Sequence, residues 1–220
     1  MAWSTLSAEE LFSFDCPNPL FRVALEDTAL VPAICNSAEL AQNALSICGF
    51  EFERAIEIVV SSRPGRGSPL CLAAYHCDND VVELLDPNLI AGTMSASDPL
   101  SHIPDQELIT SLLAHEMVHA WVSRSKWASN VSRLEDEYIA YALQLEALPH
   151  SVRRQVIESR DFEGPSSLDD LTEWVLFTDA TGFGVLAWQH FSATGNGCRA
   201  IEGVLDGSVN MRSEDVFHYP

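Results

Sequence analysis

The stretch LLAHEMVHAW, residues 112–121, holds two histidines with a glutamate directly after the first. His115 and His119 are four residues apart, so on an α-helix their side chains lie one turn apart on the same face. Two neutral imidazoles at this spacing can bind one divalent metal ion, and zinc is the usual occupant. Glu116 would lie beside that metal without binding it, where a carboxylate can take a proton from a metal-bound water. The pattern H-E-x-x-H therefore predicts metal-assisted hydrolysis with Glu116 as the general base.

Helical periodicity places both histidines on a buried face. Residues 105–124 predict a helix, and one narrow stripe along it is formed by Leu108, Leu112, His115, His119 and Val122. A buried imidazole needs a partner for each ring nitrogen, and two protonated rings one turn apart would repel each other. A divalent metal removes both difficulties. A metal-free helical core with a coincidental motif is the alternative that this stretch alone leaves open.

A catalytic zinc ion normally has three protein ligands and one position for water, so a third ligand is needed. A metzincin would supply it through H-E-x-x-H-x-x-G-x-x-H, but Val122 and Ser125 stand at the glycine and last histidine positions. The metzincin pattern is therefore excluded, and a glutamate from a second helix is the other common solution.

The next predicted helix, residues 132–148, offers three neighbouring acids. Its apolar stripe consists of Leu134, Tyr138, Tyr141, Leu145 and Leu148. Measured around the helix from the centre of that stripe, Glu137 lies about 60° away, Glu135 about 100° away and Asp136 nearly opposite. A solvated helix flank is the ordinary place for an isolated glutamate. Coming one helix after H-E-x-x-H, however, Glu137 is the predicted third ligand, and the small Ala140 allows the two helices to approach closely.

The segments HEMVH and EYIAY together resemble the gluzincin clan of zinc metallopeptidases, particularly its minimal members with a short sheet and two metal-bearing helices. The likeness covers residues 105–148. It implies that His115, His119 and Glu137 bind Zn²⁺ and that Glu116 is the general base. It also implies a zincin-like fold in which an edge strand holds an extended peptide through main-chain hydrogen bonds.

One residue departs from the gluzincin pattern, and a further residue is predicted to take part in the reaction. Many larger gluzincins hold a ligand histidine with an acid four residues after the ligand glutamate, and here that position is Tyr141. Support would then come from Asp136, a backbone carbonyl or the tyrosine hydroxyl. For the oxyanion of the reaction, His190 in VLAWQHF is the predicted donor. A histidine that simply ends an apolar helix is the other interpretation of His190.

The elements before the histidine helix predict a small sheet. Residues 1–35 are rich in proline around DCPNPLF and predict an extended or looped segment, and residues 36–49 predict a helix. AIEIVVSS predicts a strand, RPGRGSP a loop, and LCLAAYH and VVELL a hairpin around CDND. LIAGTM predicts one more strand.

From residue 105 onward the pattern is helical. The predicted helices cover residues 105–124, 132–148, 150–160 and 167–190, the last with a break at TGFG. Strands followed by helices indicate an α+β class with a small mixed or antiparallel sheet. We expect residues 1–220 to form one domain. Its parts are an N-terminal segment (1–35), a helix with the sheet (36–104), the metal-binding helices (105–148) and a helical C-terminal part (149–220).

The composition is that of a folded and strongly acidic protein. The 220 residues are 47% hydrophobic and 20% charged, with 32 acidic against 12 basic residues and a formal net charge of −20. Nucleic acid and anionic membranes are therefore poor partners, and we expect no nucleic-acid binding. No apolar run is long enough to span a membrane, and MAWSTLSAEE is not a signal peptide. The acidity is compatible with basic ligands or simply with solubility, and it does not identify a substrate.

Six cysteines without C-x-x-C spacing favour disulfides over a zinc or redox motif. Only Cys71 and Cys77 have a local reason to pair, because they bracket LAAYH. Disulfides would place the protein in the periplasm or outside the cell, after removal of a signal peptide that the printed sequence lacks. Six small buried thiols, and with them a cytoplasmic location, are the alternative.

Two functions from different classes follow from these residues. The first is a zinc metallopeptidase that acts on a peptide or protein substrate. The second is a zinc-stabilised binding domain without catalysis. An intact Glu116 favours the first, because a structural zinc site has no need of that acid.

Overall fold

The N-terminal half of the protein contains a mixed sheet of five strands, in the order β1-β2-β3-β5-β4. In this computed structural model, residues 11–64, 71–162, 167–193 and 195–211 are described. The strands are β1 (Phe12–Asp15), β2 (Phe21–Leu25), β3 (Ile56–Ser61), β4 (Ala73–His76) and β5 (Val81–Leu85). β2, β3 and β5 are parallel to one another, and the edge strands β1 and β4 are antiparallel to their neighbours.

Two helices cover one face of this sheet. They are α1 (Val31–Ser46) and α4 (Asp105–Arg124), which pack on each other. α1 also contacts β2, and α4 contacts β4 and β5. Ile56, Ile58 and Val60 are buried along β3 and alternate with the exposed Glu57. This period of two places the apolar residues on the face that the helices cover.

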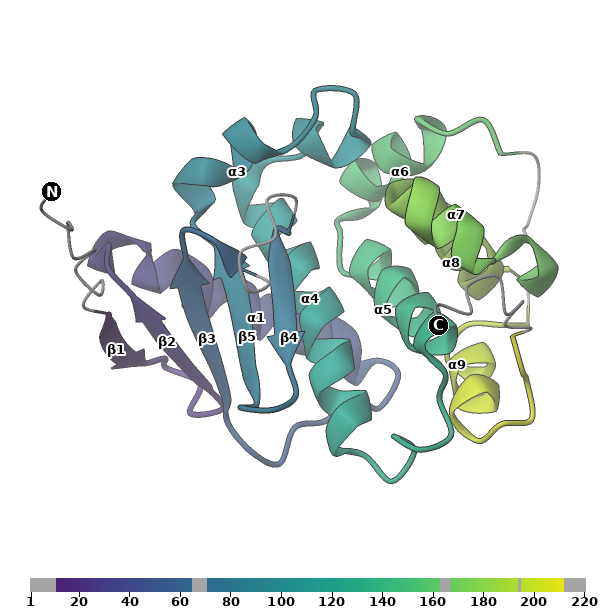
Figure 1. Cartoon of the computed structure of the whole chain (residues 1–220), viewed down its shortest axis with the longest axis horizontal. Helices are drawn as coiled ribbons and strands as arrows, with labels where there is room; N and C mark the ends of the chain where they lie inside the picture. The colour runs from purple at the N-terminus through teal and green to yellow at the C-terminus, as the bar shows by residue number, and fades with distance from the viewer. Residues whose placement is uncertain (1–10, 65–70, 163–166, 194, 212–220) are drawn as a thin grey trace, which may run out of the picture.

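The C-terminal half is helical and packs on the other side of α4 (Figure 1). Its helices are α5 (Arg133–Glu146), α6 (His150–Glu158), α7 (Glu173–Thr178), α8 (Ala180–Ser192) and α9 (Cys198–Leu205). α5 packs on both α4 and α8. Since α4 lies between the sheet and α5, it is buried around most of its circumference and not along one stripe alone. The α+β class predicted from the sequence is confirmed.

Several predicted elements match the structure closely. α4 has the predicted bounds, β3 and the β4–β5 hairpin are where expected, and α5 and α6 differ from their predicted ranges by two residues or fewer at each end. The hairpin turn includes Asp80, whose φ of 61° lies in the left-handed region that aspartate tolerates better than most residues. Most of the predicted RPGRGSP loop lies outside the described residues.

Residues 1–10 of the predicted extended or looped segment lie outside the described residues, and for residues 11–35 a segment without regular structure was the wrong prediction. This region contains β1, β2, the 3₁₀ turn η1 (Thr28–Leu30) and the beginning of α1, which starts at Val31 instead of residue 36. β2 is an interior strand whose Phe21 and Val23 are buried, and it pairs with β3 more than thirty residues away in the sequence. Its partner on the other side, β1, is too short to stand out locally. Pro32, in the first turn of α1, suits a helix start because its missing N–H has no partner there.

Two further predictions about elements were wrong. LIAGTM forms most of the helix α3 (Pro87–Thr93), because the Asp86 side chain caps the Asn88 amide and Pro87 occupies the first helical position. The region 167–190 is divided into the 3₁₀ turn η3 (Leu168–Asp170), α7 and α8. Asp179 separates the two α-helices, since its side chain caps the Gly182 amide.

Disulfides join distant parts of the fold. Cys16 bonds to Cys35 and Cys48 bonds to Cys198, so the second bond links the end of α1 to the start of α9 across 150 residues. Cys71 and Cys77 are free thiols. They lie on either side of the extended strand β4, which keeps them too far apart to bond, so the locally suggested pair does not form. In the described part of the chain, no helix is long and apolar enough to cross a membrane.

Candidate metal centre

The three predicted ligands lie together between α4 and α5. The ligand atoms of His115, His119 and Glu137 are all within 4.8 Å of one another. The Nε2 atoms of His115 and His119 lie 3.5 Å and 4.0 Å from Oε2 of Glu137. In a tetrahedral zinc site with bonds near 2.0–2.1 Å, neighbouring donor atoms are roughly 3.3 Å apart. The two distances from the histidines to Glu137 are therefore close to the spacing that such a metal requires.

Each histidine is oriented by a side chain from α5. Nδ1 of His115 lies 2.9 Å from Oε1 of Gln144, and Nδ1 of His119 lies 2.8 Å from Oδ2 of Asp136. Both partners accept a hydrogen bond from Nδ1–H, which leaves each Nε2 facing Glu137, where it can bind a metal ion once its proton is displaced. Second partners of this kind are a regular feature of metal-binding histidines. Of the three groups that the sequence analysis considered as partners for a ligand histidine, Asp136 is the one that contacts His119.

The three neighbouring acids of α5 have different contacts. Glu135 is buried, accepts hydrogen bonds from the amides of Ser132 and Met211, and completes the capping box that begins the helix. Asp136 contacts His119, and Glu137 faces both histidines. The helix cap therefore occupies Glu135, which leaves Glu137 as the acid available to a metal.

The charges of the site act strongly on its ligands. Burial opposes protonation of His119, but the hydrogen bond and charge of Asp136, with smaller contributions from Glu116 and Glu137, raise its pKa to about 9. Burial also opposes ionisation of Glu137, but hydrogen bonding and charge from His115 and the charge of His119 lower its pKa. Without a metal, the site thus prefers a proton on His119 and an ionised Glu137. A cation at this position would replace that proton.

Glu116 points to the sheet and not into the donor group. Its Oε2 accepts a hydrogen bond of 2.7 Å from the backbone N–H of Tyr75 in β4. The Tyr75 hydroxyl donates to Asp80 at 2.8 Å, and Arg124 at the end of α4 donates to the same Asp80 oxygen at 2.8 Å. α4 is therefore held against the edge strand at two points about two turns apart, and the first of them fixes the orientation of the Glu116 carboxylate.

A cleft of about 860 Å³ lies over these residues. His115, Glu116, His119 and Glu137 line it, and the edge strand β4 contributes a wall that runs from Ala73 to Tyr75. His190, the predicted oxyanion donor, is not among the lining residues. Its Nδ1 lies 2.8 Å from the Tyr138 hydroxyl, and burial lowers its pKa. The structure thus places His190 outside the cleft.

Both free thiols border the cleft. The Cys71 thiol donates to the carbonyl of Ala73 at 2.9 Å. Burial, followed by the charge of Glu116, raises the pKa of this thiol. At neutral pH Cys71 is accordingly a thiol and not a nucleophilic thiolate.

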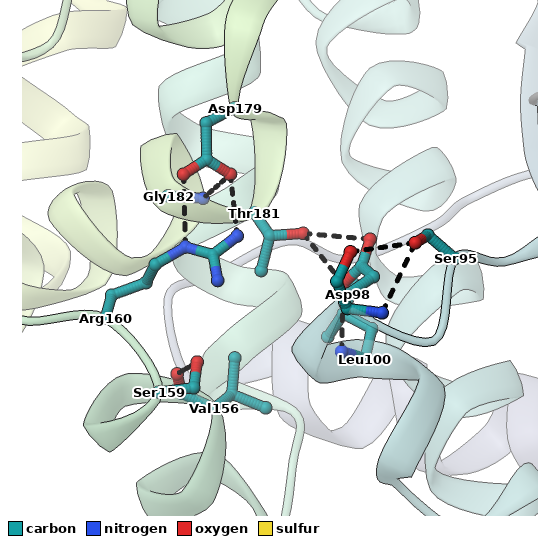
Figure 2. A network of polar contacts seen from close by, with 10 residues as sticks. Ser95, Asp98, Leu100, Val156, Ser159, Arg160, Asp179, Thr181 and Gly182 are labelled. Carbon is teal, nitrogen blue, oxygen red and sulfur yellow. Dashed lines mark hydrogen bonds and ion pairs between the residues drawn. The ribbon is translucent and has the colours of Figure 1, made fainter.

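A polar network surrounds the start of α8, next to the cleft (Figure 2). The Thr181 hydroxyl is directed at the Asp98 carboxylate, 3.2 Å away, and both residues line the cleft. Beside them, Arg160 donates two hydrogen bonds to Asp179, at 2.8 and 3.1 Å. A Cβ at Gly182 would clash with the Asp179 carboxylate, so any larger residue there would displace that carboxylate. This network ties the segment before η2 (Pro99–His102) and the end of α6 to the start of α8.

Two contributors to the site were not predicted from the sequence. Gln144 lies seven residues after Glu137, and this spacing returns it to the same helix face. A glutamine between Leu143 and Leu145 is the sequence signal that could have found it, and the structure buries this side chain to 3% exposure. The Tyr75 amide had no such signal, since every residue except proline has a backbone N–H.

The chain belongs to a family described as "Family of unknown function (DUF6639)", whose match covers residues 21–214. The match includes the sheet from β2 onward and all of the candidate metal centre. No curated protein and no solved structure matches the chain.

Proposed function

We propose that this member of the family is a zinc-dependent metallopeptidase, with His115, His119 and Glu137 as the metal ligands and Glu116 as the general base. The position of Glu116 carries the proposal. It lines the same cleft as the three donors but is not part of the donor group. A structural zinc site would normally have a fourth protein ligand and no acid beside it.

The donor set fits zinc, which commonly binds two histidines and a glutamate and keeps one position open in catalytic sites. Two histidines and one carboxylate also suit non-haem iron. The adjacent Glu116 favours hydrolysis and therefore zinc. Bound at this position, zinc would polarise a substrate carbonyl and lower the pKa of a water molecule toward neutrality.

Individual residues of the chain then have separate roles in amide hydrolysis. Glu116 takes the proton from the attacking water and later delivers it to the leaving amine. The Tyr75 amide keeps the Glu116 carboxylate in one orientation during this transfer. β4 is an edge strand that lines the cleft, so an extended peptide can lie along it. The substrate is accordingly a peptide or a protein segment in extended conformation.

A zinc-stabilised binding domain is the second candidate, and one observation favours it. The hydrogen bond from Tyr75 gives Glu116 a structural task, because it joins α4 to β4. A domain without catalysis would also use that contact.

The replacement Glu116→Gln separates the two functions. The glutamine oxygen still accepts from the Tyr75 amide, but the side chain no longer takes a proton. For a peptidase we expect the wild type to bind one zinc ion and to cleave members of a fluorogenic peptide mixture. Glu116→Gln should keep the zinc and lose about 10²–10⁴-fold in rate. Glu107→Gln, on the same helix outside the cleft, is the matched control.

Absence of zinc after reconstitution, measured by elemental analysis, would contradict the metal site. Zinc binding without cleavage by the wild type would support the binding domain. Cleavage that Glu116→Gln leaves unchanged would remove Glu116 from the mechanism.

The two disulfides support a location in the periplasm or outside the cell, because disulfides persist in oxidising compartments. Mass spectrometry of the protein from its native source, alkylated before and after reduction, tests this assignment. Four protected cysteines are expected.

A further inference from the structure

Tyr141 lies against the metal ligands, one turn after Glu137 on α5. A helical side chain leans toward the N-terminus of its helix, so Tyr141 covers the turn that carries Glu137. Its ring meets the His115 ring edge to face, with centroids 4.5 Å apart and an angle of 75°. The position that lacks the usual second acid is therefore occupied by a phenol that contacts the site directly.

The ring of Tyr141 is fixed from the side of α8. Phe183 packs on it edge to face at 5.7 Å. At Gly184, a Cβ would lie only 3.0 Å from Tyr141 Cδ1. The ring thus fits between His115 on α4 and a glycine on α8, and any larger residue at position 184 would move it.

The hydroxyl of Tyr141 differs from those of the two tyrosines discussed above. Tyr75 donates to Asp80, and Tyr138 is bonded to His190. Among the described residues, no hydrogen-bond partner is found for the Tyr141 hydroxyl. Yet it is within electrostatic reach of Glu137, Glu116 and Asp98, which all line the cleft. A partner for this donor is most simply supplied by a molecule bound in the cleft.

We infer that Tyr141 is a catalytic residue that donates a hydrogen bond to the oxyanion of the tetrahedral intermediate. This inference rests on the proposed peptidase function and identifies the residue that stabilises the negative charge on the substrate carbonyl oxygen. The water oxygen bonds to the carbonyl carbon, its proton passes to Glu116, and the carbonyl π electrons move onto the carbonyl oxygen. When the C–N bond breaks, those electrons re-form the carbonyl, and the amine leaves with the proton from Glu116. Tyr141 keeps its own proton throughout, and its hydrogen bond strengthens as negative charge develops.

Other side chains near the ligands are less suited to this role. Gln144 is engaged by His115, and the Thr181 hydroxyl donates to Asp98. His190 is bonded to Tyr138 outside the cleft. Tyr141 combines a place beside the ligands with a hydroxyl that no described residue engages.

The replacement Tyr141→Phe tests the inference, because it keeps the ring against His115 and removes only the hydroxyl. The protein is the full-length zinc form, and the substrate is a peptide that the wild type cleaves. We expect kcat to fall about 10²–10³-fold, the effect of removing one oxyanion donor, with little change in KM and in zinc content. Tyr138→Phe, which removes the neighbouring hydroxyl outside the cleft, should retain wild-type kcat.

A second measurement does not depend on turnover. A phosphinate analogue of the cleaved peptide imitates the tetrahedral intermediate, and its affinity should fall in Tyr141→Phe by about the same factor as kcat. A phosphinate affinity equal to that of the wild type would overturn the inference.

The Gly184→Ala replacement adds an independent check. By moving the ring it should lower kcat in the wild type and have much less effect in Tyr141→Phe. Equal effects in both backgrounds would contradict the assigned role.

The two proposals can fail separately. If the wild type cleaves no peptide, the peptidase function is wrong. If it cleaves and depends on Glu116, but Tyr141→Phe stays within about threefold of its kcat, only the role of Tyr141 is wrong. Loss of zinc from Tyr141→Phe would also overturn that role, since the tyrosine would then merely support His115.

Discussion

The contact between Asp136 and His119 makes a prediction about zinc affinity that does not require a substrate. Asp136→Asn keeps the size of the side chain and removes its charge. The contact is short, 2.8 Å, and both side chains are mostly buried, at 26% and 17% exposure. Replacing such a partner of a metal-binding histidine typically weakens metal affinity by roughly 10–100-fold. This corresponds to about 1.4–2.7 kcal/mol.

Proton competition changes the size of this effect with pH. In the metal-free protein the pKa of His119 is raised to about 9, with Asp136 as the largest cause that raises it. At pH 7 roughly one molecule in a hundred then has a neutral His119, and zinc binding must displace the proton from the rest. Asp136→Asn lowers this pKa and so reduces the competition. We therefore expect most of the affinity loss at pH 9 and little or none at pH 7.

The assay is competition with a zinc-binding dye of known affinity at both pH values. Asp105→Asn removes an equal charge at the exposed start of α4 and should bind zinc as the wild type does. An affinity of Asp136→Asn equal to that of the wild type at pH 9 would refute the assigned contact. A loss of the same size at both pH values would refute the role of proton competition.

Two further predictions concern stability. Replacing Cys48 and Cys198 together by serine should lower the free energy of unfolding by up to about 5 kcal/mol, because the bond closes a loop of 150 residues. Urea denaturation measures this, and an unchanged midpoint would show that the bond does not form. Asp179→Asn keeps the cap of α8 but loses the charge that pairs with Arg160, at an expected cost of about 1 kcal/mol at pH 7. Since Arg160 lowers the pKa of Asp179, this stabilisation is present above pH 4 and is lost as pH falls through the lowered native pKa. The two proteins should therefore become equally stable once the pH is below that lowered pKa, and a constant difference would contradict the ion pair.

The candidate metal ligands were predictable because their positions follow from the geometry of single helices. The spacing of His115 and His119 sets one face of α4 whatever surrounds it. The same argument separated Glu137 from Glu135 on α5. The hairpin and the bounds of α4 were equally local, since turn residues and helical periodicity lie within short stretches of sequence. For these features the sequence alone was enough.

The wrong predictions about the strands have a common cause. β2 pairs with β3 across more than thirty residues, and β1 is a strand of four residues. Neither β1 nor β2 has a sequence pattern strong enough to predict a strand without its pairing partner. For LIAGTM, apolar content suggested a strand, whereas the cap at Asp86 and the proline after it start a helix. Short apolar runs are compatible with either structure, and their ends decide between them.

The contacts around the ligands were decided by tertiary packing. Asp136 reaches His119, Gln144 reaches His115, and the Tyr75 amide reaches Glu116 only because α5 and β4 lie on either side of α4. From the sequence, His190 was the predicted oxyanion donor. In the structure, the packing of α8 places His190 against the Tyr138 hydroxyl instead. Residues on one helix are related by a fixed rotation, whereas residues on different elements are related only by how those elements pack. The sequence by itself therefore determined which atoms can bind a metal, and the tertiary structure determined which groups orient them and which donor remains free in the cleft.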